Sequence, residues 1–364
     1  MISTDRKIFE EGSAVRERMI EYGELFDELH IIIFEQKVEG RKWKVEIEKN
    51  TFAYSTNSLS KFFYIFDAIR IGYSILNAKR YTLNAFVITT QDPFETGKVG
   101  VALKNKFGIP LNIQIHTDFL SPYFRRYSFY NRLRVQFAPY TLLKADSIRV
   151  VSERIRSSLL NAKRYTLQAP VTVLPIFVDR EKLLAQPLTI DVKKSYPGFD
   201  KYLLWIGRLE KEKNALLALE TVHELKKRGV RAALIMVGEG SERERLISRT
   251  KALELNDSVF FAGYQINLLS YYQTSDALLV TSLYEGFGLV ILEAAYIGLP
   301  IISTDVGIAR EIGAHLVESH PRSFAEVLSR PLQKRSYTIP PYIHSDKQEY
   351  LDNYKSILVK TIKK

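Results

Sequence analysis

Cysteine is absent from this 364-residue chain, so neither disulfide bonds nor thiolate catalysis can contribute to its fold or chemistry. The six histidines show no paired metal-ligand spacing, which argues against a zinc site. No apolar run reaches the roughly eighteen residues that a membrane-spanning helix needs. The N-terminus, MISTDRKIFEEG, lacks the apolar segment of a secretory signal. From these absences we expect a globular, cytoplasmic protein.

Negative charge is scarce in one part of the chain. The net charge is +11, and residues 51–178 contain 17 Lys and Arg against 6 Asp and Glu, whereas the flanking parts are nearly balanced. Such an asymmetry indicates an anionic partner, for example a membrane surface, a nucleic acid or a phosphorylated substrate. A surface that only keeps the protein in solution is the alternative.

Short apolar runs alternate with helical patterns from end to end. LHIIIFE (29–35), LNIQIHT (111–117) and SIRVVS (147–152) are typical of buried parallel strands, and a second series begins at KYLLWIG (201–207). Two such series predict an α/β protein with two doubly wound domains. We expect an N-terminal domain over 1–179, a linker over 180–200, a C-terminal domain over 201–344 and an amphipathic helix over 345–364.

Two cations follow the first strand of the second series, in WIGRLEKEKN. Gly207 permits a turn, and Arg208 and Lys213 come next. Because ligands of open α/β sheets bind at the carboxyl ends of strands, these cations are well placed to neutralise a diphosphate. A solvated, charged loop is the alternative. The later MVGEGSERERL places Gly238 and Gly240 in a second strand-to-helix turn, where glycine lets a backbone approach a ligand.

Two glutamates stand eight residues apart in SLYEGFGLVILEA. Glu285 lies in a glycine-rich loop, and Glu293 lies in an apolar run that predicts a buried helix. Burying a carboxylate is costly unless it has a polar partner, so we expect either a basic residue or a polar ligand beside each glutamate. In the structural alternative, Glu285 caps the helix and Glu293 pairs with a buried arginine.

The order of these motifs resembles the retaining family-4 glycosyltransferases. The resemblance runs from about Lys201 to Glu318 and rests on GRLEKEK, GEG, SLYEGFGLVILEAAYIGLP and STDVG. It implies the GT-B fold, in which two Rossmann-like domains face a cleft and the C-terminal helix crosses back to the N-terminal domain. It also implies a nucleotide-diphosphate sugar as the donor substrate.

The resemblance assigns roles by matching position. Arg208 and Lys213 would hold the diphosphate and stabilise it as the leaving group, Glu285 would contact the donor sugar, and Glu293 would accept hydrogen bonds from the ribose. The remaining donor-site candidates are Gly207, Gly238, Gly240, Phe287, Gly288 and Leu289.

The N-terminal half offers fewer candidates. His116 ends the predicted strand IQIHTDF, where the resemblance implies a residue near the donor sugar. Gly12 precedes the first helix, like the glycine loop of the family. Asp118, Ser152 and Arg156 are further candidates.

We predict metal-independent, cofactor-free transfer with retention of configuration, because Arg208 and Lys213 can neutralise the leaving group and no metal-binding motif stands out. Front-side attack is the expected route, and a covalent intermediate on a glutamate is the competing one. A non-catalytic GT-B protein that binds nucleotide sugars is the alternative function.

An aromatic and basic stretch, SPYFRRYSFYNRLRVQFAPYTLLK (121–144), suits an anionic membrane surface. A core helix with a charged outer face and a single-stranded nucleic acid site are the alternatives, nucleic acid being the weaker. With the resemblance, a lipid-linked saccharide or polysaccharide precursor fits best as the acceptor. We therefore expect a peripheral protein at the inner membrane face.

Overall fold

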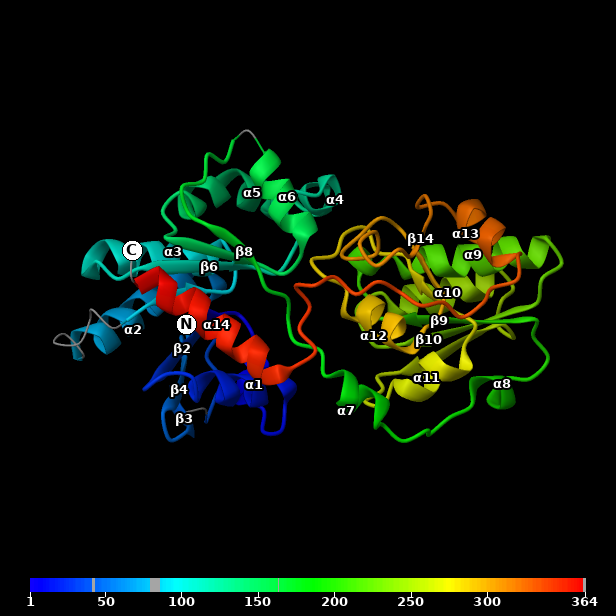
Figure 1. Ribbon diagram of the computed structural model, residues 1–364, viewed down its shortest axis with the longest axis horizontal. Coiled ribbons are helices and arrows are strands. Elements are labelled where there is room, and N and C mark those ends of the chain that lie inside the picture. The colour runs from blue at the N-terminus through cyan, green and yellow to red at the C-terminus, as the bar shows by residue number, and fades with distance from the viewer. Residues whose placement is uncertain (41–42, 79–85, 163, 363–364) are drawn as a thin grey trace. The chain divides into compact units, whose positions relative to one another are not determined.

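The computed structural model describes residues 1–40, 43–78, 86–162 and 164–362. The chain divides into two compact units, each with its own β-sheet (Figure 1). Unit 1 comprises Met1–Leu120, Ser128–Pro175 and Asp346–Lys364, and unit 2 comprises Ser121–Tyr127 and Ile176–Ser345.

Unit 1 is built on a sheet with the strand order β3-β4-β2-β1-β5-β6-β7-β8. Its neighbouring strands are parallel except β3 and β4, which are antiparallel. Its strands are β1 (Ile2–Ser3), β2 (Leu29–Ile33), β3 (Lys44–Glu48), β4 (Thr51–Ser55), β5 (Ile88–Thr90), β6 (Leu111–Ile115), β7 (Ser147–Val150) and β8 (Val171–Val173).

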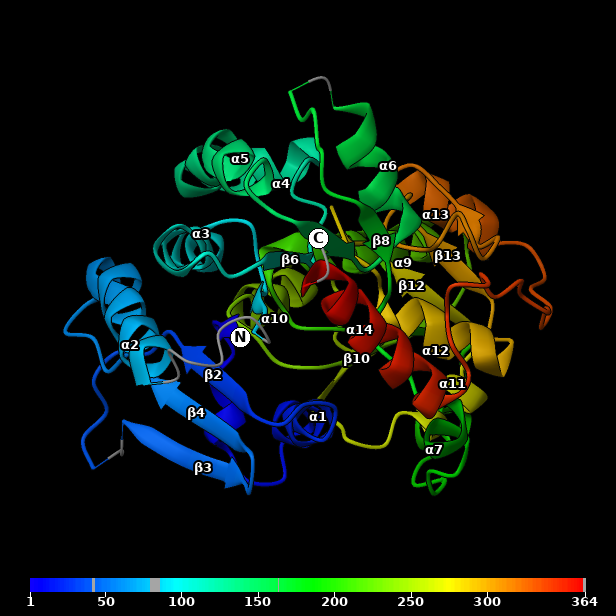
Figure 2. The same ribbon diagram turned by 60° about the vertical axis from the view of Figure 1, so that its left-hand side comes forward.

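Helices cover both faces of this sheet. Figure 2 shows α2, α3 and α5 on one side, with α3 between the other two, and α1 and α14 on the opposite side. The helical segments are η1 (Arg6–Phe9), α1 (Ala14–Gly23), η2 (Lys61–Phe63), α2 (Tyr64–Ala78), α3 (Glu95–Phe107), α5 (Phe129–Leu142), α6 (Glu153–Asn161) and α14 (Lys347–Ile362).

Unit 2 has a parallel sheet with the order β11-β10-β9-β12-β13-β14. Its strands are β9 (Lys201–Ile206), β10 (Ala232–Val237), β11 (Val259–Gly263), β12 (Ala277–Val280), β13 (Ile301–Ser303) and β14 (His315–Leu316). Its helical segments are α4 (Pro122–Tyr127), α7 (Arg180–Leu184), α8 (Val192–Ser195), η4 (Lys211–Lys213), α9 (Ala215–Lys227), α10 (Arg243–Ala252), α11 (Leu269–Thr274), α12 (Leu289–Ile297) and α13 (Pro321–Leu328).

The central strands of unit 2 are apolar along their whole length because helices cover both of their faces. All six residues of β10, AALIMV, are buried, and so are all four of β12. The two doubly wound sheets confirm the predicted α/β fold.

The C-terminal helix α14 returns to unit 1 and packs on β6 and β7. The hydroxyls of Tyr22 and Tyr350 lie 2.6 Å apart, and the rings of Tyr22 and Tyr354 stack with centroids 4.2 Å apart. Buried Arg149 donates to the carbonyls of Leu174 and Pro175, and it lies over the ring of Tyr354. These contacts confirm the expected crossing of the last helix to the N-terminal unit.

The structure differs from the sequence expectations in three places. The antiparallel pair β3 and β4 at the sheet edge was not predicted. Residues 180–200, expected as a linker, carry α7 and α8 and belong to unit 2. The stretch 121–144 is two helices, because Ser128 breaks it and caps α5 by accepting from the Asn131 amide; the first helix, α4, belongs to unit 2.

Candidate functional site

The predicted cations and one predicted glutamate meet at the same edge of the unit 2 sheet. The chain order of the strands reverses between β9 and β12, and this switch point is where open α/β sheets bind ligands. Arg208 and Lys213 follow β9, and Glu285 follows β12. The tertiary fold thus brings together residues that lie 72 positions apart in the sequence.

Lys213 and Glu285 form an ion pair between Nζ and Oε1. The side chains are 20% and 12% exposed, so the pair is partly shielded from water. The Ser282 hydroxyl donates to the same carboxylate oxygen at 2.8 Å, and Thr281 donates to the Lys213 carbonyl at 3.0 Å. Trp205 in turn donates to Thr281 at 2.9 Å, which links this site to the core of unit 2.

Arg208 is held more loosely. Its guanidinium is 72% exposed and pairs at 2.7 Å with Glu212, four residues further along the chain. The Glu212 side chain is only 12% exposed; its other carboxylate oxygen accepts from the Tyr127 hydroxyl at 3.5 Å. Sequence reasoning missed Glu212 and Tyr127. The spacing of Arg208 and Glu212 is a detectable signal, whereas the contact with α4 has none in the sequence.

Glu293 lies in the second turn of α12 and has a different partner. The Tyr272 hydroxyl donates to Oε2 of Glu293 at 2.6 Å. Burial raises the pKa of Glu293, and the hydrogen bond from Tyr272 only partly opposes this. The structure therefore replaces the arginine partner of the structural alternative with a tyrosine, which sequence reasoning did not identify.

The glycines after β9 and β10 allow the two loops to pack backbone against backbone. Gly238 has φ +132°, and a Cβ there would lie 1.9 Å from the Gly207 carbonyl oxygen. A Cβ on Gly240 would lie 2.4 Å from the carbonyl oxygen of Leu209. A side chain at either position would push the Arg208 loop away from its place. The close packing of the two loops thus explains why these positions are glycine, without requiring a bound ligand.

The glycine-rich loop before α12 is also fixed by backbone contacts. Gly288 has φ +90° and stands directly before α12, and the buried Phe287 accepts from the Ile308 amide at 2.9 Å. A Cβ on Gly307 would lie 2.2 Å from the Phe287 carbonyl oxygen. Leu289 is 40% exposed. The Phe287 side chain is therefore part of the core, which leaves its backbone as the group that could meet a ligand.

In unit 1, His116 follows β6 and Gly12 follows β1, both at the carboxyl edge of that sheet. His116 Nε2 lies 3.3 Å from Gln114 Oε1. Burial, with the nearby positive charges of Arg149 and Arg18, lowers the pKa of His116 to about 3. The imidazole is therefore neutral at physiological pH. Gly12 has φ +73° and precedes Ser13, which caps α1.

The three further candidates have structural partners. Asp118 is buried, Ser152 caps α6 and Arg156 pairs with Glu153 at 2.7 Å. None of the helices in the described part of the chain combines the length and apolarity that crossing a bilayer requires.

Two parallel-sheet units, one with cations and carboxylates at its switch point, define a GT-B glycosyltransferase fold. Comparison with known proteins agrees. Residues 189–330 match the family described as glycosyl transferases group 1. The resemblance to GT-B glycosyltransferases that the sequence motifs indicated is thus confirmed.

Individual relatives are distant. An uncharacterised glycosyltransferase of Methanocaldococcus jannaschii is 24% identical over 78% of this chain and 70% of its own length. The alpha-monoglucosyldiacylglycerol synthase of Streptococcus pneumoniae is 25% identical over 62% of this chain and 53% of its own length. The structure of Anabaena HepE in complex with UDP and glucose has a TM-score of 0.65 at 16% identity, and covers 90% of this chain and 88% of HepE. This likeness supports the fold.

Proposed function

We propose that this glycosyltransferase moves a sugar from a nucleotide-diphosphate sugar to a saccharide or lipid-linked acceptor, with retention of configuration. The observation that carries the proposal is the Lys213–Glu285 ion pair, with Arg208 nearby in sequence, at the switch point of the family-matched unit. Doubly wound sheets bind their ligands at this point.

The cations would stabilise the departing nucleoside diphosphate. In the structure Lys213 is paired with Glu285 and Arg208 with Glu212. Because Arg208 is exposed, its ion pair contributes little and can be exchanged for phosphate oxygens at low cost. A diphosphate that takes over Lys213 would leave the Glu285 carboxylate available to the sugar hydroxyls. This exchange links donor binding to the arrangement of the reacting sugar.

Glu293 would accept hydrogen bonds from the ribose hydroxyls. Such donors favour the ionised carboxylate, whereas burial favours the protonated one. Donor binding should therefore lower the pKa of Glu293. Consequently the donor should bind more weakly as the pH falls through the range in which Glu293 takes up its proton.

Retention would follow from front-side attack. The bond between the anomeric carbon and the phosphate oxygen breaks, the acceptor hydroxyl forms its new bond on the same face, and its proton passes to the departing phosphate. Arg208 and Lys213 would carry the charge stabilisation, so we propose that neither a metal ion nor another cofactor takes part. His116, neutral because of its low pKa, would donate or accept a hydrogen bond near the donor sugar and would not act as a proton donor.

The basic segment supports an acceptor at an anionic membrane. Residues 51–178 hold the excess of positive charge, and the streptococcal relative is named for the synthesis of a glycolipid. We therefore propose a lipid-linked saccharide or polysaccharide precursor as the acceptor and a peripheral location at the inner membrane face.

The test does not require the acceptor. The protein is incubated with UDP-, GDP- and ADP-sugars in the presence of a chelator, and slow hydrolysis of the donor is followed by NMR. We expect one nucleotide class to be consumed, with the sugar released first in the donor's own anomeric configuration. Release of the opposite anomer would contradict retention. Nucleotide binding without turnover would favour the non-catalytic alternative.

A further inference from the structure

Two segments of unit 1 expose large apolar side chains to an unusual extent. At the start of α2, Leu59, Phe62 and Phe66 are 80%, 89% and 70% exposed. On α5, Phe129 and Phe137 are 72% and 52% exposed, and the exposed set also includes Phe63, Tyr130, Leu133 and Tyr140. Clusters of exposed apolar side chains of this size mark an interaction site.

A pocket connects the two segments. It has a volume of about 150 Å³ and is lined by residues of the α2 start, the α3 start and α5, namely Ile65, Pro93, Phe94, Glu95, Lys98, Tyr130, Leu133, Arg134 and Phe137. Figures 1 and 2 both show α3 lying between α2 and α5. An apolar cavity of about this volume accommodates a six-carbon ring. The pocket is thus large enough for part of a hydrocarbon chain.

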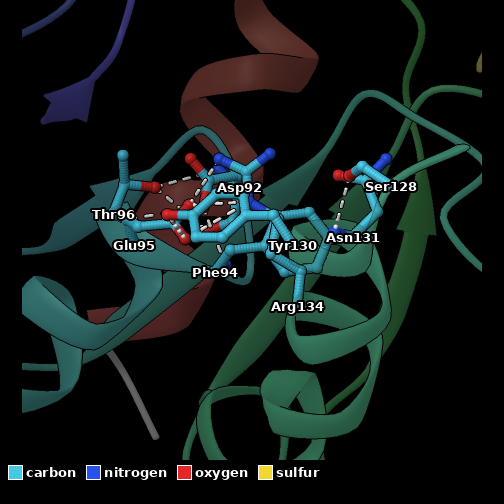
Figure 3. Close-up of polar contacts among 8 residues, drawn as sticks. All are labelled: Asp92, Phe94, Glu95, Thr96, Ser128, Tyr130, Asn131 and Arg134. Carbon is cyan, nitrogen blue, oxygen red and sulfur yellow. Dashed lines mark hydrogen bonds and ion pairs between the residues drawn. The ribbon is translucent and has the colours of Figure 1, made fainter. Parts of the chain in front are cut away.

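Three polar side chains of the pocket, those of Glu95, Tyr130 and Arg134, are bonded to one another (Figure 3). The fourth, Lys98, holds its Nζ over the ring of Phe137, 5.4 Å from the centroid. Arg134 donates to Glu95 Oε2 from Nε at 3.0 Å and from Nη2 at 2.8 Å, and the Tyr130 hydroxyl donates to Oε1 at 2.7 Å. The guanidinium also lies over the rings of Tyr130 and Phe94, 4.5 and 5.4 Å from their centroids. Burial alone would raise the pKa of Glu95, but the hydrogen bonds from Arg134 hold it below its usual value.

Asp92, close in sequence to Glu95, forms its hydrogen bonds with the backbone. Its carboxylate accepts from the amides of Phe94 and Thr96 at the start of α3. A sugar would need hydrogen-bonding groups that are free to reach it, whereas a hydrocarbon chain needs only apolar walls. The carboxylate and the guanidinium of this pocket are bonded to each other, and Ile65, Leu133 and Phe137 add apolar walls, so the pocket favours a hydrocarbon guest.

Charge identifies the larger partner. Exposed Lys61 lies at the α2 start, exposed Arg132 lies on α5, and exposed Lys144 follows the end of α5. Residues 51–178 have nearly three times as many basic as acidic residues. Aromatic side chains and long cationic ones together suit the boundary between lipid headgroups and acyl chains. An acidic lipid surface is complementary to both features.

We propose that unit 1 docks on an anionic membrane through this surface, and that the pocket between α2, α3 and α5 takes a hydrocarbon chain of a membrane lipid. This inference deepens the proposed function, because it names the membrane lipid as a ligand of the basic segment. It also adds the α2 start, at Leu59–Phe66, which the sequence reading did not include.

Vesicle binding tests the surface. Sedimentation with phosphatidylglycerol vesicles and with phosphatidylcholine vesicles is compared for the wild type and the double variant Phe62→Ser, Phe66→Ser. Each exposed phenylalanine that enters the lipid should improve binding by about tenfold, so the double variant should bind phosphatidylglycerol about a hundredfold more weakly. The matched control is Tyr264→Ser, Ile266→Ser in unit 2, where the replaced side chains are 72% and 77% exposed.

Equal binding by the wild type and the Phe62, Phe66 variant would overturn the proposal, as would failure of the wild type to bind phosphatidylglycerol at low salt. Preference for phosphatidylcholine would also contradict it. If the surface instead binds a protein, a protein complex will cover the exposed residues and vesicles will leave them accessible to solvent. That outcome would also overturn the proposal.

A fluorescent reporter tests the pocket. In the variant Leu133→Trp, tryptophan emission is measured with phosphatidylglycerol that carries brominated acyl chains. We expect quenching well beyond that seen in the wild type, whose two tryptophans, Trp43 and Trp205, provide the background. If the variant binds vesicles but its quenching does not exceed the background, the proposal that an acyl chain occupies the pocket is wrong.

Donor hydrolysis without vesicles keeps the two proposals apart. The phenylalanine variants should retain full hydrolysis, because their changes lie outside the donor residues. Loss of vesicle binding with retained hydrolysis supports this inference. Absence of hydrolysis in the wild type with intact vesicle binding would instead reject the proposed function alone.

Discussion

Units 1 and 2 share a doubly wound sheet but use their polar side chains differently at the switch point. In unit 2 the loops after β9 and β12 present Arg208, Lys213 and Glu285, and two ion pairs hold these charges in place. In unit 1 the switch point lies between β1 and β5. There the Asp92 carboxylate accepts from the amides of Phe94 and Thr96, and Gly12 provides a turn.

The surfaces of the two units also differ, in charge and in exposed aromatic side chains. Unit 1 contains most of the basic segment and carries most of its exposed aromatic side chains at the α2 start and on α5, whereas the charges of residues 179–364 nearly balance. The family match lies entirely within unit 2. The comparison teaches that a similar sheet can serve a compact, charged ligand in one unit and, by our proposal, an extended lipid surface in the other.

The largest effect should come from Lys213→Ala. Loss of a cation that stabilises the leaving group should lower kcat for donor turnover by about a hundredfold to a thousandfold. Vesicle binding by unit 1 should not change. The control is Lys211→Ala on the same 3-10 helix, where the side chain is exposed. Equal loss in both variants would show that the effect is not specific to the Glu285 ion pair.

Arg149→Met should destabilise unit 1. The change removes the donor to the buried carbonyls of Leu174 and Pro175, which are left unbonded, and one of the two partners of Gln114 Oε1. We expect a loss of about 3 kcal/mol in the free energy of unfolding. The two tryptophans report on one unit each, Trp43 on unit 1 and Trp205 on unit 2.

Urea unfolding followed through single-tryptophan variants (Trp43→Phe or Trp205→Phe) separates the two signals. The Arg149→Met midpoint should fall for the Trp43 signal. Arg156→Ala, which removes only an exposed ion pair, is the control and should change stability by less than about 0.5 kcal/mol. A fall in the Trp205 midpoint alone would be inconsistent with the role of Arg149 in unit 1.

Glu293→Gln should stabilise unit 2 while weakening nucleotide binding. The folded pKa of Glu293 is raised, so the folded state binds the proton more tightly than the unfolded chain, and wild-type stability falls as the pH rises through this range. Glutamine keeps an acceptor for Tyr272 without the charge. We expect a gain on the order of 1 kcal/mol at neutral pH and none below the unfolded pKa.

Thermal unfolding at several pH values, with and without the nucleotide, measures both effects. Tyr272→Phe provides the comparison, since it removes the hydrogen bond and keeps the carboxylate. A pH-independent difference between Glu293→Gln and the wild type would contradict the assigned pKa shift.

The smallest effect should come from Tyr127→Phe. The Tyr127 hydroxyl approaches Glu212 at 3.5 Å, the outer limit of a hydrogen bond, and the tyrosine is exposed. Stability should change by less than about 0.5 kcal/mol, and donor turnover by less than threefold. A tenfold loss of turnover would show that α4 positions Arg208 through Glu212 more strongly than this distance indicates.

Local patterns predicted most of the fold. Fully apolar runs such as AALIMV identified buried parallel strands, because both faces of such strands are covered by helices. The pairing of β3 with β4 was not predicted, because the edge strand β3, KVEIE, is short and mostly polar. The break at Ser128 also escaped notice, although a serine that caps a helix is a local signal.

The candidate site was predicted only in part. The spacing of Arg208, Lys213 and Glu285 after their strands indicated one sheet edge, because parallel strands end at the same side. The tyrosine partners of the site's glutamates were not predictable. Tyr272 contacts Glu293 from another helix, and Tyr127 contacts Glu212 from a helix of the basic segment.

The sequence by itself determined the two alternating α/β series, the position of Arg208, Lys213 and Glu285 after strands, and the uneven charge, because periodicity and composition are local properties. Tertiary structure alone decided which carboxylate pairs with Lys213, that α14 packs against unit 1, and that residues of α2, α3 and α5 line one pocket. These features depend on contacts between residues far apart in the chain, whose free energies appear only when the sheets and their helices have packed.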